Sequence, residues 1–286
     1  MAEECTHDCS TCEANCASRE GQKVNLEDFR EKLNENSKVR KVIGVISGKG
    51  GVGKSFVTSY LATLMNRKGY KVGVLDADIT GPSIPAAFNI HEKAMGNEFG
   101  IVPAKTAKGT SIISINMMLK TEDSPVIWRG PVIAGVVKQF WTDVFWDDID
   151  FLFVDMPPGT GDVPLTVFQS IPVDGVVVVT SPQTLVSTIV SKAVNMANEM
   201  NVPIIGLVEN YSYVECPTCK EKINVFGDSH VEEVAKKFGL TVLAHIPMTP
   251  VIAEKLDNGA VEELEGNWLD ETADFIESQY VLNDED

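Results

Sequence analysis

The stretch Gly48-Lys-Gly-Gly-Val-Gly-Lys-Ser55 decides the fold of this chain. It fits the phosphate-binding pattern G-x-x-x-x-G-K-[ST] and stands between an apolar run, 41–47, and a helix-like run, 56–67. Its glycines let successive N–H groups point inward, and the following helix adds its positive end, so a triphosphate meets several donors together. We expect Lys54 to reach the β- and γ-phosphates and the Ser55 hydroxyl to ligate Mg2+. The expected nucleotide loop consists of Gly48, Lys49, Gly50, Gly51, Val52, Gly53, Lys54 and Ser55.

Strand-like and helix-like runs alternate through the rest of the chain, which predicts an α/β fold with a mostly parallel sheet and helices on both faces. Ligands of such sheets bind at the carboxyl ends of the strands. The expected strand 71–76 ends in Asp76, with Asp78 just beyond, and the expected strand 150–155 ends in Asp155. We expect these acids to lie beside the nucleotide, with Asp76 either in the metal shell or holding its loop.

Five motifs resemble, in their order along roughly residues 40–260, the Mrp/ApbC-type iron–sulfur cluster carriers. This family belongs to the deviant Walker A (SIMIBI-like) class of P-loop ATPases, together with ParA, MinD and the nitrogenase iron protein. The motifs are G-K-G-G-V-G-K-S, D-A-D-I-T-G-P-S from Asp76, D-M-P-P-G-T-G-D from Asp155, the Glu-Asn pair at 209–210, and C-P-T-C from Cys216.

The resemblance implies a role for several residues of the nucleotide site. Lys49 would reach across a homodimer to the other subunit's nucleotide, where a cation offsets charge on the transferring phosphoryl group. Asp78 would position the attacking water, and Asp155 would hold Mg2+ through a coordinated water. Asn210 would read the adenine, since an amide both donates and accepts. The guanine motif N-K-x-D does not occur in the sequence, so ATP is expected rather than GTP.

The six cysteines lie in two places, and the second is the pair Cys216 and Cys219. One such pair offers two thiolates, whereas a cubane cluster or a structural zinc usually takes four. A two-fold dimer would bring two pairs together, and the resemblance implies a labile 4Fe-4S cluster at that interface, passed on to apo iron–sulfur proteins. Zinc on the same four thiolates, a redox-active dithiol, and a site within one chain that uses N-terminal cysteines remain open.

Residues 1–22 form a polar, cysteine-rich arm with almost no apolar side chains. Its thiolates could wrap a 4Fe-4S cluster or zinc, with the metal supplying the folding energy, or the arm could be a flexible tail that hands metal onward. The arm's cysteines are Cys5, Cys9, Cys12 and Cys16. Residues 23–38 carry apolar side chains at helical spacing and predict an amphipathic linker helix, which leaves 39–286 as the ATPase domain. Arg129, within W-R-G-P, could contact phosphate, a second subunit or an acid.

The composition opposes nucleic acid and membranes as partners. With 24 basic and 41 acidic residues, the net charge of -17 repels phosphate backbones and anionic lipid. No apolar run approaches the roughly 18 residues of a membrane span, and the chain opens without a basic-then-apolar signal, so a cytoplasmic location is expected. The rival hypotheses are a spatial-organising ATPase like MinD or ParA, and a zinc-stabilised, nucleotide-dependent binding module.

Overall fold

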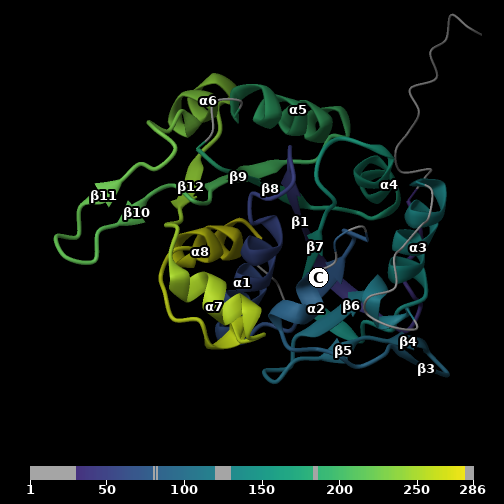
Figure 1. Ribbon diagram of the computed structural model, residues 1–286. Coiled ribbons are helices and arrows are strands. Elements are labelled where there is room, and N and C mark those ends of the chain that lie inside the picture. Colours follow the sequence, from purple (N-terminus) through teal and green to yellow (C-terminus); the bar gives the residue numbers. More distant parts are fainter. Residues whose placement is uncertain (1–29, 80, 82, 120–129, 183–185, 281–286) are drawn as a thin grey trace, which may run out of the picture.

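A computed structural model describes residues 30–79, 81, 83–119, 130–182 and 186–280, and its centre is an eight-stranded sheet (Figure 1). The strand order is β12-β9-β8-β1-β7-β2-β6-β5, and every neighbouring pair is parallel except β5–β6, at one edge. The predicted mostly parallel sheet is therefore confirmed. The strands are β1 (Lys38–Ser47), β2 (Val72–Asp76), β5 (Ala104–Lys105), β6 (Ser111–Ser114), β7 (Asp148–Asp155), β8 (Gly175–Thr180), β9 (Ile204–Glu209) and β12 (Val242–His245).

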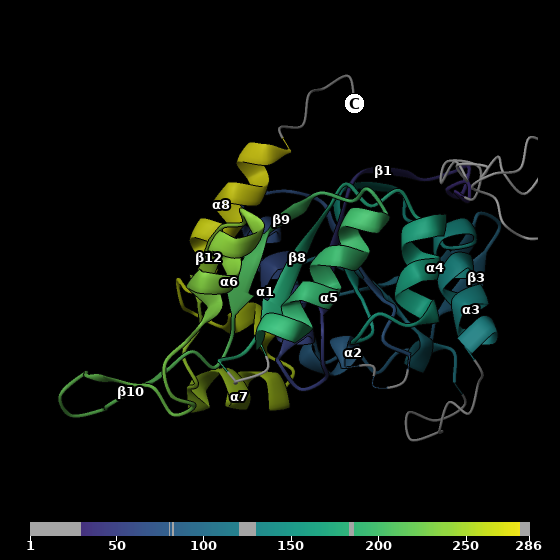
Figure 2. The ribbon, with the colours of Figure 1, turned by 90° about the horizontal axis from the view of Figure 1, so that it is seen from above.

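Helices cover both faces of the sheet (Figure 2). They are α1 (Lys54–Arg67), α2 (Ile84–Ala87), α3 (Gly130–Thr142), α4 (Asp162–Ser170), α5 (Val186–Glu199), α6 (Val231–Phe238), α7 (Pro250–Asp257) and α8 (Asp270–Gln279), with 3-10 turns η2 (Ile115–Met117) and η3 (Val261–Glu263). On one face α1 packs against β1, β2 and β7, and on the other α5 packs against β8 and β1. None of the helices in the described ranges is long and apolar enough to cross a membrane.

The central strands are buried along nearly their whole length because both of their faces are covered. Val72–Asp76 and Gly175–Thr180 are buried at every position, as expected for parallel strands between two helical layers. The register pairs Val45 with Asp155 and Asp76 with Asp155. The strand ends are therefore level, which places the polar residues that terminate them at one edge of the sheet.

The described part of the predicted linker helix is irregular. Residues 30–37 form a turn and extended chain, β1 begins at Lys38, and so the helix does not extend over this stretch. The Glu31 N–H donates to the Ser170 carbonyl, and the Trp141 indole donates to the Glu31 carbonyl. Leu33 packs against the core. These contacts fix the segment to α3 and α4 without helical structure.

Two small hairpins stand outside the central sheet. The first joins β3 (Met95–Asn97) to β4 (Gly100–Val102). The second joins β10 (Val214–Glu215) to β11 (Lys222–Ile223) and projects away from the body in both ribbon views (Figures 1 and 2). The C-P-T-C motif forms the connection of this second hairpin, which we call the cysteine hairpin and define as residues 213–228.

Candidate functional site

The loop between β1 and α1 has the backbone of a phosphate-binding loop. Gly51 and Gly53 adopt φ of +76° and +80°, a region that favours glycine. A side chain at Gly53 would also collide with the amide of Asn210. Helix α1 begins at Lys54, directly after the loop, so its free N–H groups and positive end face the space where an anion would bind.

Three side chains of α1 converge on Asp155 at the end of β7. Lys54 Nζ lies 2.8 Å from Asp155 Oδ2, and Ser55 Oγ donates to the same oxygen at 2.6 Å. Thr58 Oγ1 donates to the other oxygen, Oδ1, at 2.7 Å. Asp155 is fully buried and Lys54 is 5% exposed, so one charge and two hydroxyls hold a carboxylate inside the core.

The acids after β2 have different surroundings. Burial, together with the neighbouring charge of Asp155, raises the pKa of Asp76 to about 8, although Lys54 and a hydrogen bond from Ser114 oppose the shift. Asp76 also accepts the N–H of Asp78 at 3.1 Å, which holds the start of the loop. Asp78 is partly exposed, and its Oδ2 lies 3.6 Å from Lys54 Nζ. Of the two acids, Asp78 therefore faces the space above the loop.

A cavity of about 350 Å³ opens over the loop. The loop after β7 forms one wall, and the Gly159 N–H donates to the Ser47 carbonyl at 2.8 Å. Tyr211 and Leu256 come from the far end of the chain. The cavity is lined by Ser47, Gly50, Gly51, Val52, Gly53, Lys54, Ser55, Phe56, Asp78, Gly81, Ser83, Pro158, Tyr211 and Leu256. Lys49 lies in the loop but does not line this cavity.

Asn210 connects β9 to the phosphate-binding loop. Its side-chain amide donates to the Val52 carbonyl at 3.0 Å, and its N–H donates to the Thr180 carbonyl at 2.9 Å. The side chain is 2% exposed. The next residue, Tyr211, has a φ of +59°, which turns the chain toward the cysteine hairpin.

The cysteine hairpin presents its thiols at the surface. The Cys216 N–H donates to the Glu221 carbonyl, and the Lys220 N–H donates to the Cys216 carbonyl. Backbone N–H groups of Cys219 and Thr218, the Cys219 thiol and the Lys220 charge lower the pKa of Cys216. Cys216 is half-buried and Cys219 is exposed. The turn therefore favours thiolate, the form that binds metals.

Among the described residues, the hairpin supplies only part of a metal site. Across the described ranges, no group of three or more histidine, cysteine, aspartate or glutamate side chains gathers where it could hold a metal ion. Cys216 and Cys219 thus offer two ligands, and the N-terminal cysteines lie outside the described residues, as does Arg129.

Comparison with known proteins assigns the chain to one family. Residues 38–278 match the ParA family model described as NUBPL iron-transfer P-loop NTPase. The chain belongs to this family. The iron–sulfur cluster carrier protein of Clostridium perfringens is 49% identical over 233 residues, which cover 79% of this chain and 82% of the relative. The predicted resemblance to iron–sulfur carriers is therefore confirmed.

Solved structures agree with this family assignment. A nucleotide-binding protein of Archaeoglobus fulgidus in complex with ADP superposes with a TM-score of 0.75 at 39% identity, covering 86% of this chain and 96% of its own. The MinC:MinD cell division complex of Aquifex aeolicus superposes with a TM-score of 0.59 at 17% identity, covering 83% and 96%. At that identity the second match shows the fold alone. The P-loop NTPase family and the ADP-bound neighbour support NTPase activity for this chain.

The structure brings part of the predicted site of this iron-transfer NTPase together. Lys54, Ser55, Asp78 and Asp155 converge within hydrogen-bond or ion-pair distance, and Asn210 touches their loop. Other contacts escaped the sequence analysis, because they depend on which strands become neighbours. They include the bond from Thr58 to Asp155, the position of Tyr211 in the cavity wall, and the contact between Glu209 and His245. The string Glu-Asn-Tyr-Ser offered a signal for Glu209, since a charged residue at the end of a buried strand needs partners.

Proposed function

We propose that this protein is an ATP-hydrolysing iron–sulfur cluster carrier. Two subunits would bind a labile 4Fe-4S cluster between their Cys216 and Cys219 pairs and pass it to apo-proteins. The observation that carries the proposal is a hairpin with two free cysteines on a body that has a phosphate-binding loop. A relative that is 49% identical over 82% of its own length bears the name iron–sulfur cluster carrier protein, which supports the same function here.

The residues around the cavity fit a nucleotide with Mg2+. Ser55 Oγ and the Asp155 carboxylate are neighbouring oxygen donors, the ligand type that Mg2+ prefers. When bound, the ion would neutralise charge on the phosphates. Lys54 would contact the β- and γ-phosphates, Asp78 would orient the attacking water, and Asn210 would bond the adenine. The loop's N–H groups would hold the phosphates in place while these residues act.

A dimer would complete both sites. Lys49 of each subunit would reach the other subunit's nucleotide, which fits its position outside the cavity of its own chain. The two cysteine hairpins would supply four thiolates, the usual complement for a cubane cluster. Since both nucleotide and cluster would then bind across one interface, each would change the affinity for the other.

Metal analysis of anaerobically prepared protein tests this function. We expect about four iron and four acid-labile sulfide per dimer in the wild type, and neither above background in Cys216→Ala/Cys219→Ala. Nucleotide affinity of the double variant should match that of the cluster-free wild type, because the hairpin lies outside the cavity. Iron that is indifferent to these two cysteines would reject the carrier proposal.

Two other functions give different results in the same measurements. A zinc-stabilised binding module would contain zinc without sulfide, since zinc also takes four thiolates, and would not turn over ATP. A MinD- or ParA-like organiser would sediment with liposomes or DNA at low salt. The net charge of -17 argues against such binding.

A further inference from the structure

Glu209, the last residue of β9, is a fully buried carboxylate with three donors. Its Oε1 accepts from Ser229 Oγ at 2.5 Å, and its Oε2 accepts from Ser212 Oγ at 2.5 Å. His245 Nδ1 lies 3.2 Å from Oε2. A buried charge without partners would cost several kcal/mol. Glu209 therefore depends on these three groups, and its carboxylate in turn fixes their positions.

The two serines stand at the two ends of the cysteine hairpin. Ser212 directly precedes residues 213–228, and Ser229 directly follows them. Backbone bonds fix the same root, because the Ser212 N–H donates to the Ile246 carbonyl and the Met248 N–H donates to the Tyr213 carbonyl. Ser229 Oγ also accepts the Val231 N–H at the start of α6. One carboxylate therefore closes the hairpin at its base.

The chain neighbours of Glu209 reach the phosphate-binding loop. Asn210 donates to the Val52 carbonyl, and a Cβ at Gly53 would lie 3.3 Å from the Tyr211 hydroxyl. Tyr211 has a φ of +59°, an uncommon conformation for this residue type, so the surroundings must hold residues 209–212 in place. Of residues 209–212, the two central ones thus contact the phosphate-binding loop, and the two outer ones contact the root of the hairpin.

The charged and hydroxyl groups around Glu209 stabilise the base of the hairpin. Burial alone would raise the pKa of Glu209, but the bonds from His245, Ser212 and Ser229 together lower it. Glu209 raises the pKa of His245, and Glu232 on α6 adds to the effect from the other ring nitrogen. Hydrogen bonds to an ionised carboxylate are about twice as strong as neutral ones. We call Glu209, Ser212, Ser229 and His245 the carboxylate clasp.

We propose that Glu209 is a positioning residue that couples the nucleotide cavity to the cysteine hairpin through the carboxylate clasp. The proposal rests on the proposed function, in which Asn210 bonds the nucleotide base. An Asn210 amide that turns to the base gives up the Val52 carbonyl, which moves the end of β9. Because Glu209 holds both ends of the hairpin, that movement changes the setting of Cys216 and Cys219. A coupling of this kind must act in both directions.

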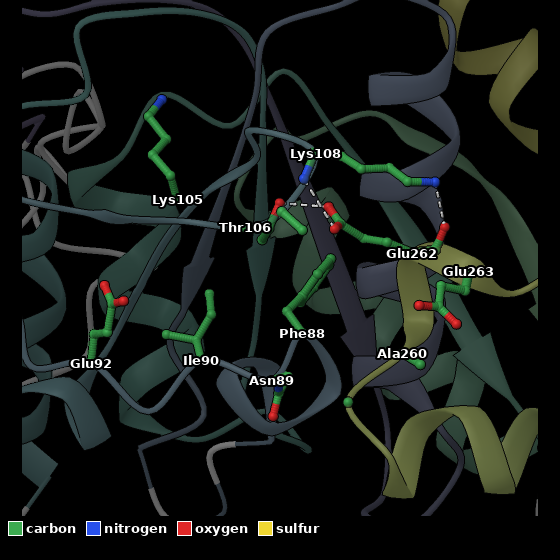
Figure 3. Close-up of a pocket in the computed structure, with 12 residues that line it drawn as sticks. Phe88, Asn89, Ile90, Glu92, Lys105, Thr106, Lys108, Ala260, Glu262 and Glu263 are labelled. Carbon is green, nitrogen blue, oxygen red and sulfur yellow. Dashed lines mark hydrogen bonds between the residues drawn. The ribbon is translucent and has the colours of Figure 1, made fainter.

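A second buried glutamate supplies the matched control. Glu262 on η3 is 8% exposed, and its carboxylate accepts from Thr106 Oγ1 and from the Lys108 N–H at 3.2 Å (Figure 3). It lines a cavity of about 310 Å³ near the β5 edge of the sheet. Glu262 resembles Glu209 in burial and in its hydroxyl partner, but Thr106 and Lys108 lie outside the hairpin and the phosphate-binding loop.

The test measures how fast the apo-protein's hairpin thiols react with an alkylating reagent. Peptide mass spectrometry separates Cys216 and Cys219 from the N-terminal cysteines, and each rate is taken with and without a non-hydrolysable ATP analogue and Mg2+. In the wild type we expect the nucleotide to change the rate by about fivefold or more. In Glu209→Gln and in Ser229→Ala the change should fall below about twofold, with nucleotide Kd within about threefold of wild type. Glu262→Gln should retain the full effect.

The outcomes separate this proposal from the proposed function. Ser229→Ala removes one hydroxyl at a half-buried position, so it decides the matter if Glu209→Gln fails to fold. A nucleotide effect that survives in Ser229→Ala, or is missing from the wild type, overturns the coupling. Cluster loading is measured separately on the wild type. A wild type that loads no cluster yet shows the clasp-dependent effect would reject the carrier function and keep the coupling.

Discussion

The nucleotide cavity and the cysteine hairpin are held in opposite ways. The cavity is built on buried charge, with Lys54 5% exposed and Asp155 fully buried at the end of a central strand. The hairpin hangs on two residue pairs, Val214–Ile223 and Glu215–Lys222, and its apolar side chains Ile223, Val225 and Phe226 are between 40% and 56% exposed. The packed core holds the nucleotide cavity in place, whereas bonds at the base of the cysteine hairpin hold the hairpin.

This difference predicts how strongly single substitutions should affect each site. In the cavity, Lys54 and Ser55 share the buried Asp155, which would lose a partner if either were removed, so single substitutions there should have large effects. In the hairpin, the chemistry is carried by two thiols that the rest of the fold does not need. Substitutions in either region should therefore leave the structure of the other region intact, except at the carboxylate clasp.

We expect the largest effect of a single substitution at Lys54, in the nucleotide cavity. Lys54→Ala removes the cation that would contact the β- and γ-phosphates, and it leaves Asp155 buried without its charge partner at 2.8 Å. We expect ATP hydrolysis to fall by about 100-fold or more.

Cluster loading of Lys54→Ala is the control for folding and for the independence of the hairpin. Iron and sulfide after reconstitution without nucleotide should match the wild type, since the thiols lie outside the cavity. If hydrolysis continued at the wild-type rate, the proposed nucleotide chemistry would be wrong. A loss of loading together with hydrolysis would mean that the two regions are not separable.

A smaller effect is expected from Thr58, which bonds Asp155 but has no predicted contact with the nucleotide. Thr58→Val deletes the bond to Oδ1 at 2.7 Å and leaves that oxygen unsatisfied. Groups that support a metal ligand typically contribute tenfold to 100-fold, so we expect the Mg2+ concentration for half-maximal hydrolysis to rise about tenfold. Thr63→Val is the matched control, because Thr63 is equally buried on α1 and bonds the Ser59 carbonyl instead. Equal behaviour of the two variants would contradict the assignment.

Much of the nucleotide site could be predicted because a short sequence pattern determines it. The loop from Gly48 to Ser55 contains the glycines its backbone requires, and Asp155 ends an apolar run that can be little else than a buried strand. Both features are local. Thr58 could not be found in this way, since its role depends on α1 crossing above β7, which is a long-range contact.

The periphery of the molecule was harder to predict for the same physical reason. The cysteine motif lies in the loop of a hairpin whose strands are two residues long, and strands this short leave no pattern in the sequence. The apolar spacing through Leu33 predicted a helix, but residues 30–37 bond to α3 and to the end of α4, and their internal bonds form a turn at Asn34 rather than a helix. Short segments follow their tertiary partners more than their own periodicity.

Base recognition should respond more weakly than hydrolysis. Asn210→Ala removes the amide that we expect to read adenine, and it also removes the bond to Val52. We expect discrimination of ATP over GTP to fall by about tenfold, with a smaller loss of ATP affinity. Asn195→Ala, at an exposed position of α5, should change neither value. Competition binding measures the ratio, and an unchanged ratio would remove Asn210 from the base-reading role.

The smallest effect is expected at His245 and depends on pH. Glu209 and Glu232 raise the pKa of His245 above its ordinary 6.5 against the opposing effect of burial, while the bonds that Glu209 receives lower the pKa of that carboxyl. A raised folded-state pKa contributes stability that is complete below the unfolded pKa and is lost as pH rises through the folded pKa. The denaturation midpoints of wild type and His245→Gln should therefore differ most near about pH 6 and converge toward about pH 9.

Chemical denaturation at several pH values measures this convergence. Because His245 is 39% exposed, solvent screens its pairs and the difference should remain modest even at the acid end. Glu209→Gln in the same series removes the acid that raises the pKa of His245. The extra stability that His245 contributes at low pH should therefore be lost in this variant. A gap between wild type and His245→Gln that widens with pH would show that the imidazole is neutral in the folded protein. The clasp would then be held by its two serines alone.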